Sequence, residues 1–153
     1  MGKLGEELKQ RKPFRNLREE AILNVWRTGD ILADRLHGLL KGRGLSQTQY
    51  NALRILRGAG EHGLPCGEVG ARMLTRDPDI TRLLDRLARR GLARRSRVRE
   101  DHRVVLAKIT PAGSKLLTEL EGPVGELIDE MLSHMKDAEL RTMIATLEQI
   151  RGD

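Results

Sequence analysis

Residues 75–109 constrain the fold more than any other stretch, because a pattern typical of a helix is followed there, without a long linker, by a pattern typical of strands. Apolar side chains recur at spacings of three and four from Ile80 to Leu87, which predicts a helix with one buried face. We expect the helix to start at Asp77 and Pro78, since aspartate caps helix starts and proline suits the first turn. Its opposite face is rich in arginine.

A β-hairpin is predicted directly after this helix. Gly91 is typical of a helix end. Residues 92–97 and 104–109 are both compatible with strands, and the charged residues between them fit a turn. The pattern therefore predicts a helix followed by a two-stranded hairpin.

The net positive charge of the chain is concentrated in the same region. The 153 residues include 28 Lys and Arg against 22 Asp and Glu, a net charge of +6. Residues 72–103 hold eleven arginines, no lysine and five acids, a difference of +6, so the remainder is balanced at 17 against 17. Guanidinium groups match phosphate oxygens and the guanine edge. A solvated charged face is the alternative, but this confinement favours a polyanionic partner.

Composition excludes several kinds of protein. The single cysteine, Cys66, rules out an intrachain disulfide and a cysteine-based zinc cluster. No apolar run resembles a signal peptide or a membrane-spanning helix, so we expect a soluble, cytoplasmic protein. Serines and histidines lie in no catalytic or metal-ligand pattern, so we expect no enzyme, cofactor or metal. For His37 and His134 a metal site stays open beside a surface role, and for Cys66 a redox role stays open beside packing.

Amphipathic patterns on both sides of the hairpin region predict further long helices. One covers residues 14–41; two more cover 111–135 and 137–150, the last capped by Asp137. Pro123 interrupts the second, where we expect a kink. The apolar stripes of these helices carry more apolar surface than one small domain needs to bury. This favours a dimer over a monomer in which the stripes pack on the chain's own core.

The segments between the long helices carry their own signals. Ser46 and Gln49 form a capping box, which predicts a helix start. Residues 64–73 fit a short helix, in which Gly67 and Gly70 allow either close packing or local softness. The first thirteen residues are charged and are expected to be loose.

Three motifs together resemble the winged helix-turn-helix regulators of the MarR family. They are TRLLDRLARRGLARR from Thr81, the Asp101-His102-Arg103 turn, and VVLAKIT followed by PAG. The resemblance covers about residues 45–113 well and the flanking helices loosely. It implies a mainly α fold with a small β-hairpin wing, in one domain, residues 1–153. The winged helix would occupy 46–110, between dimerisation helices at 14–41 and 111–150.

The resemblance also implies roles for the basic residues. The helix at 78–90 resembles a recognition helix, and the hairpin resembles a wing whose Arg103, oriented by Asp101, enters the minor groove. From helical spacing we expect Asp85 to pair with Arg82 and Arg89; an ordinary surface pair is the alternative. Either Arg94 or Arg95 would clamp a phosphate. The candidate DNA contacts are Arg76, Pro78, Thr81, Arg82, Asp85 and Arg86 on the helix, and Arg94, Arg95, Arg97, Arg99, Asp101, His102 and Arg103 on the wing.

The expected function is a repressor that binds a palindromic operator in double-stranded DNA as a homodimer. The resemblance implies a small aromatic or acidic effector, with Trp26, His37, Tyr50 and Arg54 as candidate binding residues. Two alternatives stay open: an architectural protein that binds DNA without sequence preference, and an interaction module with an acidic partner.

Overall fold

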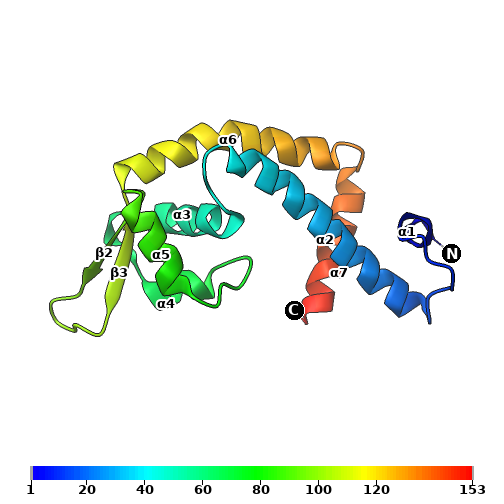
Figure 1. The fold of residues 1–153 in the computed structure, drawn as a ribbon, viewed down its shortest axis with the longest axis horizontal. Helices are drawn as coiled ribbons and strands as arrows, with labels where there is room; N and C mark the ends of the chain where they lie inside the picture. Colours follow the sequence, from blue (N-terminus) through cyan, green and yellow to red (C-terminus); the bar gives the residue numbers. More distant parts are fainter. Residues whose placement is uncertain (1, 153) are drawn as a thin grey trace.

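The computed structural model describes residues 2–152, which form seven α-helices, one 3-10 helix and a small sheet (Figure 1). The elements in chain order are α1 (Lys3–Glu7), α2 (Leu17–Lys41), α3 (Gln47–Ala59), η1 (Gly60–His62), β1 (Leu64–Pro65), α4 (Cys66–Ala71), α5 (Ile80–Arg89), β2 (Ala93–Arg97), β3 (Val105–Ile109), α6 (Pro111–Leu132) and α7 (Asp137–Arg151). Helices α3 to α5 and the sheet lie at one end, α1 and α7 lie at the other, and α6 arches between them. This confirms the mainly helical fold with a wing.

The sheet has three antiparallel strands in the order β1-β3-β2, one more than the hairpin predicted. The hairpin register pairs Ala93 with Ile109 and Arg97 with Val105. Strand β1 pairs Leu64 with Ala107. It is only two residues long, too short to leave an alternating pattern in the sequence.

The buried face predicted for α5 is confirmed, but the helix starts later than expected. Leu83, Leu84 and Leu87 are buried in the core. The cap is Asp79, which accepts a hydrogen bond from the backbone N–H of Arg82 at 3.0 Å, so the expectation for Asp77 was wrong. Asp77 instead accepts from the N–H of Asp79, an Asx turn that holds its carboxylate two residues before the N-cap.

Other helix boundaries also differ from the predictions. Helix α1 occupies part of the segment expected to be loose. Helix α4 spans only Cys66–Ala71, because β1 takes the first residues of the predicted helix. Helix α6, which is capped by Thr110, ends at Leu132, earlier than predicted; it includes Pro123 and is curved along its length (Figure 1). The N-cap of α7 is Lys136, not Asp137, and its N–H donates to Glu139.

Gly70 does not mark a position where the backbone must approach another element closely. A Cβ at Gly70 would lie 3.7 Å from the side chain of Ile80, an ordinary van der Waals distance. Around Gly67 there is open space. Neither position therefore excludes a methyl group, so close packing does not require the two glycines.

The long helices outside the winged helix leave much apolar surface exposed. No residue of α7 is buried, and Leu40 is the one buried residue of α2. Trp26 is 65% exposed and Ile144 is 53% exposed. None of the helices in residues 2–152 has the length and hydropathy of a membrane span.

Candidate nucleic-acid interface

The solvent face of α5 presents a row of side chains that the fold leaves available. Arg82 is exposed on the side opposite the buried leucines, and Thr81 and Arg86 are exposed on the flanks of the helix. Within the described residues neither guanidinium forms a hydrogen bond or an ion pair with another side chain. Because an exposed guanidinium keeps five N–H donors, this face can bind an anionic, acceptor-rich partner.

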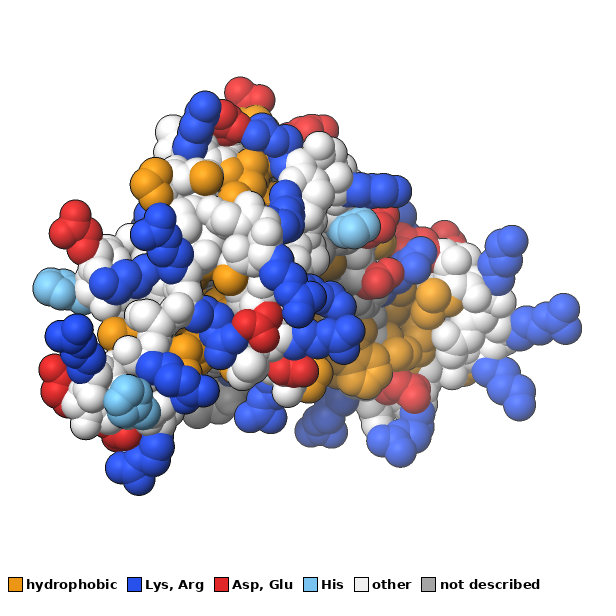
Figure 2. All heavy atoms as spheres, turned by 60° about the vertical axis from the view of Figure 1, so that its left-hand side comes forward, with side chains coloured by type: hydrophobic (Ala, Val, Ile, Leu, Met, Phe, Trp, Pro, Cys, Tyr) orange, Lys and Arg blue, Asp and Glu red, His pale blue; other side chains and the backbone are white. Residues whose placement is uncertain are grey.

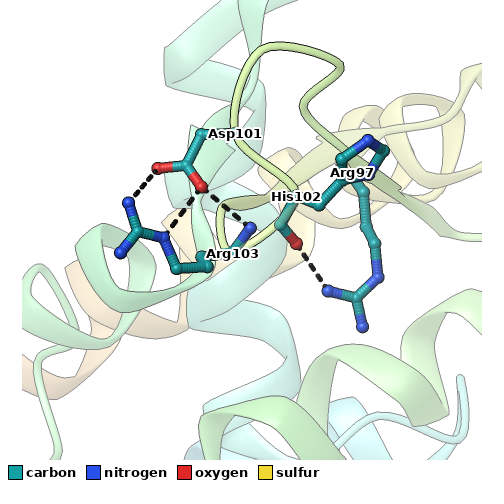
Figure 3. Close-up of polar contacts among 4 residues, drawn as sticks. All are labelled: Arg97, Asp101, His102 and Arg103. Atoms are coloured by element: carbon teal, nitrogen blue, oxygen red, sulfur yellow. Dashed lines mark hydrogen bonds and ion pairs between the residues drawn. The ribbon is translucent and has the colours of Figure 1, made fainter.

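The wing consists of β2, β3 and the turn between them, and its tip is held by two sets of hydrogen bonds (Figure 3). Asp101 Oδ1 accepts from the backbone N–H of Arg103 at 3.1 Å and from its Nε at 3.0 Å, and Oδ2 lies 3.4 Å from Nη2. Arg97 Nη1 donates to the carbonyl oxygen of His102 at 2.7 Å. The hydrogen bonds from Arg103 lower the pKa of Asp101, so this carboxylate is charged at neutral pH. Arg103 remains 91% exposed although one edge of it is held.

Asp85 has a different partner from the one expected. It pairs with Arg95 on β2, not with Arg82 or Arg89 on its own helix. The Arg95 side chain is mostly buried between the helix and the sheet, where a charged donor requires an acceptor. Burial lowers the pKa of Arg95, but hydrogen bonds to Asp85 and Cys66 outweigh burial and raise it. Arg95 therefore joins the wing to α5.

Cys66 has a basic neighbour that the sequence did not reveal. Its thiol contacts Arg95, while the residue packs against the hydrophobic core as a free, half-buried cysteine. Among the described residues no three His, Cys, Asp or Glu side chains are grouped as a metal site would require.

The other candidate contacts are distributed over the same end of the molecule. Arg94 and Arg99 lie on or beside the wing and Arg76 and Pro78 lie in the loop before α5; all four are exposed. Figure 2 shows Lys and Arg side chains spread over this face, with acidic side chains interspersed among them. The basic sequence cluster thus becomes a basic surface.

A cavity of about 420 Å³ lies between α2, α3 and α6, next to the loop that precedes α5. Leu32, Leu36 and Met131 are among its apolar walls, and Tyr50 and Arg54 also line it. The Arg54 guanidinium lies 5.9 Å from the centre of the Tyr50 ring. Trp26 and His37 are on the exposed surface and do not line the cavity. Trp26 lies on the same side of α2 as Ala33, which lines the cavity, but two turns nearer the start of the helix, and His37 lies on another side than Leu36.

Together, a buried three-helix core, a recognition-type helix with an arginine face and a basic wing define a winged-helix DNA-binding protein. The comparisons with known proteins identify its family. A family model described as MarR family matches residues 43–104. A MarR transcription factor from Planctomyces limnophilus is 39% identical, with 90% of this chain and 99% of that chain covered and a TM-score of 0.70. The chain belongs to the MarR family of transcriptional regulators.

Other relatives are more distant. The transcriptional regulator MhqR of Bacillus subtilis is 27% identical over 117 residues, which cover 76% of this chain and 79% of MhqR. A MarR mutant of Escherichia coli, complexed with operator DNA, has the same fold at 23% identity and a TM-score of 0.77, covering 88% and 98% of the two chains. Bordetella bronchiseptica BpsR also has this fold, at 19% identity and a TM-score of 0.80, with 93% of this chain and 99% of BpsR covered. The binding of BpsR to DNA is regulated by 6-hydroxynicotinic acid.

Proposed function

We propose that this regulator is a ligand-responsive repressor that acts in the cytoplasm and binds a palindromic operator as a homodimer. The observation that carries the proposal is the face of α5, where Thr81, Arg82 and Arg86 are exposed beside a basic wing. Operator DNA bound to a family member of the same fold supports it. In this proposal residues 46–110 bind DNA, and residues 14–41 and 111–150 form the dimer.

The proposed mechanism assigns each basic group to a part of the duplex. Helix α5 enters the major groove, where Arg82 and Arg86 contact bases or phosphates. Arg76 and Arg94 contact phosphates, since Arg95 is occupied by Asp85. The tip of the wing lies in or beside the minor groove; its contact residues are Arg97, Arg99, His102 and Arg103.

Selection of binders from a pool of random duplexes tests this function. Enrichment of a palindrome with half-sites about one helical turn apart is the expected result. Binding without enrichment would instead support an architectural protein. No binding at low salt would contradict both readings and support an interaction module with an acidic partner.

Arg82 and Arg103 should contribute differently to DNA binding. A bidentate Arg–guanine contact favours the correct base over a wrong one by about 1–3 kcal/mol. Arg82→Ala should therefore reduce the affinity for the cognate site most and remove the base preference at one base pair of each half-site. The minor groove distinguishes little beyond A·T from G·C and its own width. Arg103→Ala should therefore weaken cognate and scrambled duplexes more evenly and reduce the salt slope by about 0.9 for each phosphate that the protein no longer neutralises.

Fluorescence anisotropy on cognate and scrambled duplexes at several salt concentrations measures both effects. Asp101→Ala should partly reproduce Arg103→Ala, because this carboxylate holds the guanidinium. Unchanged affinities and an unchanged salt slope for Arg103→Ala would show that the wing tip does not contact DNA.

The cavity supports a proposed effector site for a weak aromatic acid. Its apolar walls suit a ring, and Arg54, beside the Tyr50 ring, offers a cation for a carboxylate. Thr75 and Leu74 also line it, so an occupant would contact the segment that leads into α5. Regulation of BpsR by 6-hydroxynicotinic acid is a precedent within the same fold.

We expect a bound aromatic acid to lower operator affinity by about 5- to 150-fold, the usual range of coupling between two sites. A thermal-shift screen of aromatic carboxylates, followed by anisotropy titration, measures this. Arg54→Ala should abolish the response and leave operator affinity without ligand unchanged, since Arg54 is not among the proposed DNA contacts. If no compound stabilises the protein, the proposed effector class is wrong.

A further inference from the structure

The C-terminal end of α5 is attached to the end of α2 by Arg90, the residue that follows α5. Its Nη1 donates to the carbonyl oxygen of Gly44 at 2.6 Å, and its Nη2 donates to that of Arg43 at 3.2 Å. Arg90 therefore differs from Arg82 and Arg86, although all three belong to the same basic cluster. Its guanidinium is directed toward the protein's own backbone.

The loop after α2 is shaped to accept this guanidinium. The backbone N–H groups of Arg43 and Gly44 donate to the last turn of α2, and their carbonyl oxygens accept from Arg90. Gly44 has a φ of +67°, a backbone conformation that residues with a side chain rarely adopt. A Cβ there would lie 3.4 Å from Arg90 Nη2, so the guanidinium packs directly against the glycine.

The same loop is attached to α6. The Arg43 side chain pairs with Glu119 of α6, and the hydrogen bond from Arg43 lowers the pKa of Glu119, which keeps the pair charged at neutral pH. Arg90 thus links α5 to a junction between two helices of the proposed dimerisation region. The main packing neighbours of α5 itself are α3, α4 and β2.

We propose that Arg90 is a positioning residue, which fixes the recognition helix relative to α2 and so sets the half-site spacing that the dimer accepts. This inference rests on the proposed dimeric binding of a palindrome. In a two-fold dimer the distance between the recognition helices is determined by how rigidly each is attached to the dimerisation helices. One extra base pair moves a half-site by about 3.4 Å and rotates it by about 35°. A loose attachment tolerates that change; a rigid one rejects it.

The test compares operators whose half-sites are separated by the selected spacing or by one base pair more or less. The wild type should discriminate strongly. Arg90→Ala should reduce this discrimination about tenfold, as expected from the loss of one or two hydrogen bonds per subunit. Its salt slope should equal that of the wild type, because Arg90 binds backbone carbonyls and not phosphates. Arg90→Lys keeps the charge but not the two parallel N–H donors, so its discrimination between spacings should lie between those of the wild type and Arg90→Ala.

Arg89→Ala is the matched control. It removes the same charge one residue earlier, from an exposed side chain without a hydrogen bond to the α2–α3 loop, so it should leave the spacing preference unchanged. If Arg90→Ala does not fold, Arg90→Lys carries the comparison. Wild-type discrimination retained in the folded Arg90 variants, or a salt slope reduced in Arg90→Ala, would overturn this inference alone. A wild type without any spacing preference would overturn the proposed dimeric function and the inference with it.

Discussion

Gly113→Ala should destabilise the protein by about 3 kcal/mol, at the upper end of the usual cost of overpacking. A Cβ at Gly113 would lie 2.2 Å from the carbonyl oxygen of Leu92 and 2.9 Å from the Ile109 side chain. The oxygen belongs to the backbone and accepts a hydrogen bond from the Thr110 N–H, so it cannot rotate away. The first turn of α6 would have to move away from the α5–β2 junction, and the Thr110 cap would be disrupted with it.

Gly125→Ala is the matched control for this effect. It lies in the same helix, and nothing is within 4 Å of the position of its Cβ. Alanine is favoured over glycine in a helix by about 1 kcal/mol, so this variant should be as stable as the wild type or more stable. Urea unfolding at one fixed protein concentration measures both variants, since dimerisation makes stability depend on concentration. Equal midpoints for Gly113→Ala and the wild type would contradict the close approach of α6 to Leu92.

Patterns within single elements predicted most of the fold. The spacing of Leu83, Leu84 and Leu87 identified the buried face of α5, and all three are in the core. The capping box of Ser46 and Gln49 is present at the start of α3. Both signals are local, because a helix repeats every 3.6 residues and a cap acts over three.

Contacts between elements were not predictable in the same way. Asp85 could pair equally well with Arg82, Arg89 or a residue elsewhere, and the choice of Arg95 depends on how β2 lies against α5. Strand β1 exists because Leu64 and Pro65 meet β3, and two residues carry no periodicity. The bonds of Arg90 to the α2–α3 loop span more than forty residues of sequence. Such pairs are set by tertiary packing, which periodicity does not describe.

The candidate sites show the same division between local and tertiary information. Thr81, Arg82 and Arg86 are exposed, as expected for positions outside the buried stripe of α5, and their contact with DNA remains a prediction. Of the four candidate effector residues, Tyr50 and Arg54 line the cavity, whereas Trp26 and His37 do not. The sequence identified polar and aromatic side chains on the right helices but not which of them meet around a cavity.

Ile144→Glu should convert the protein from a dimer to a monomer and weaken operator binding by about 100-fold or more, the usual gain from linking two binding events. Helix α7 has no buried residue, although Leu140, Met143, Ile144, Leu147 and Ile150 form one apolar stripe along it. A stripe of this kind requires a partner, and a second copy of the chain provides the same stripe across a two-fold axis. Because Ile144 is 53% exposed, glutamate should cost the isolated subunit little. In a dimer each interface would receive two buried charges.

Gln149→Glu is the control, because it adds the same charge to the same helix on the face opposite the stripe. Sedimentation equilibrium at micromolar concentration should give a dimer for the wild type and for Gln149→Glu, and a monomer with unchanged helix content for Ile144→Glu. Anisotropy on the selected palindrome should then show the large loss of affinity for Ile144→Glu alone, while binding to an isolated half-site stays equal in all three proteins. A wild type that sediments as a well-behaved monomer would contradict the dimer. A monomeric variant that binds the palindrome as tightly as the wild type would show that tight binding does not require a dimer on the two half-sites.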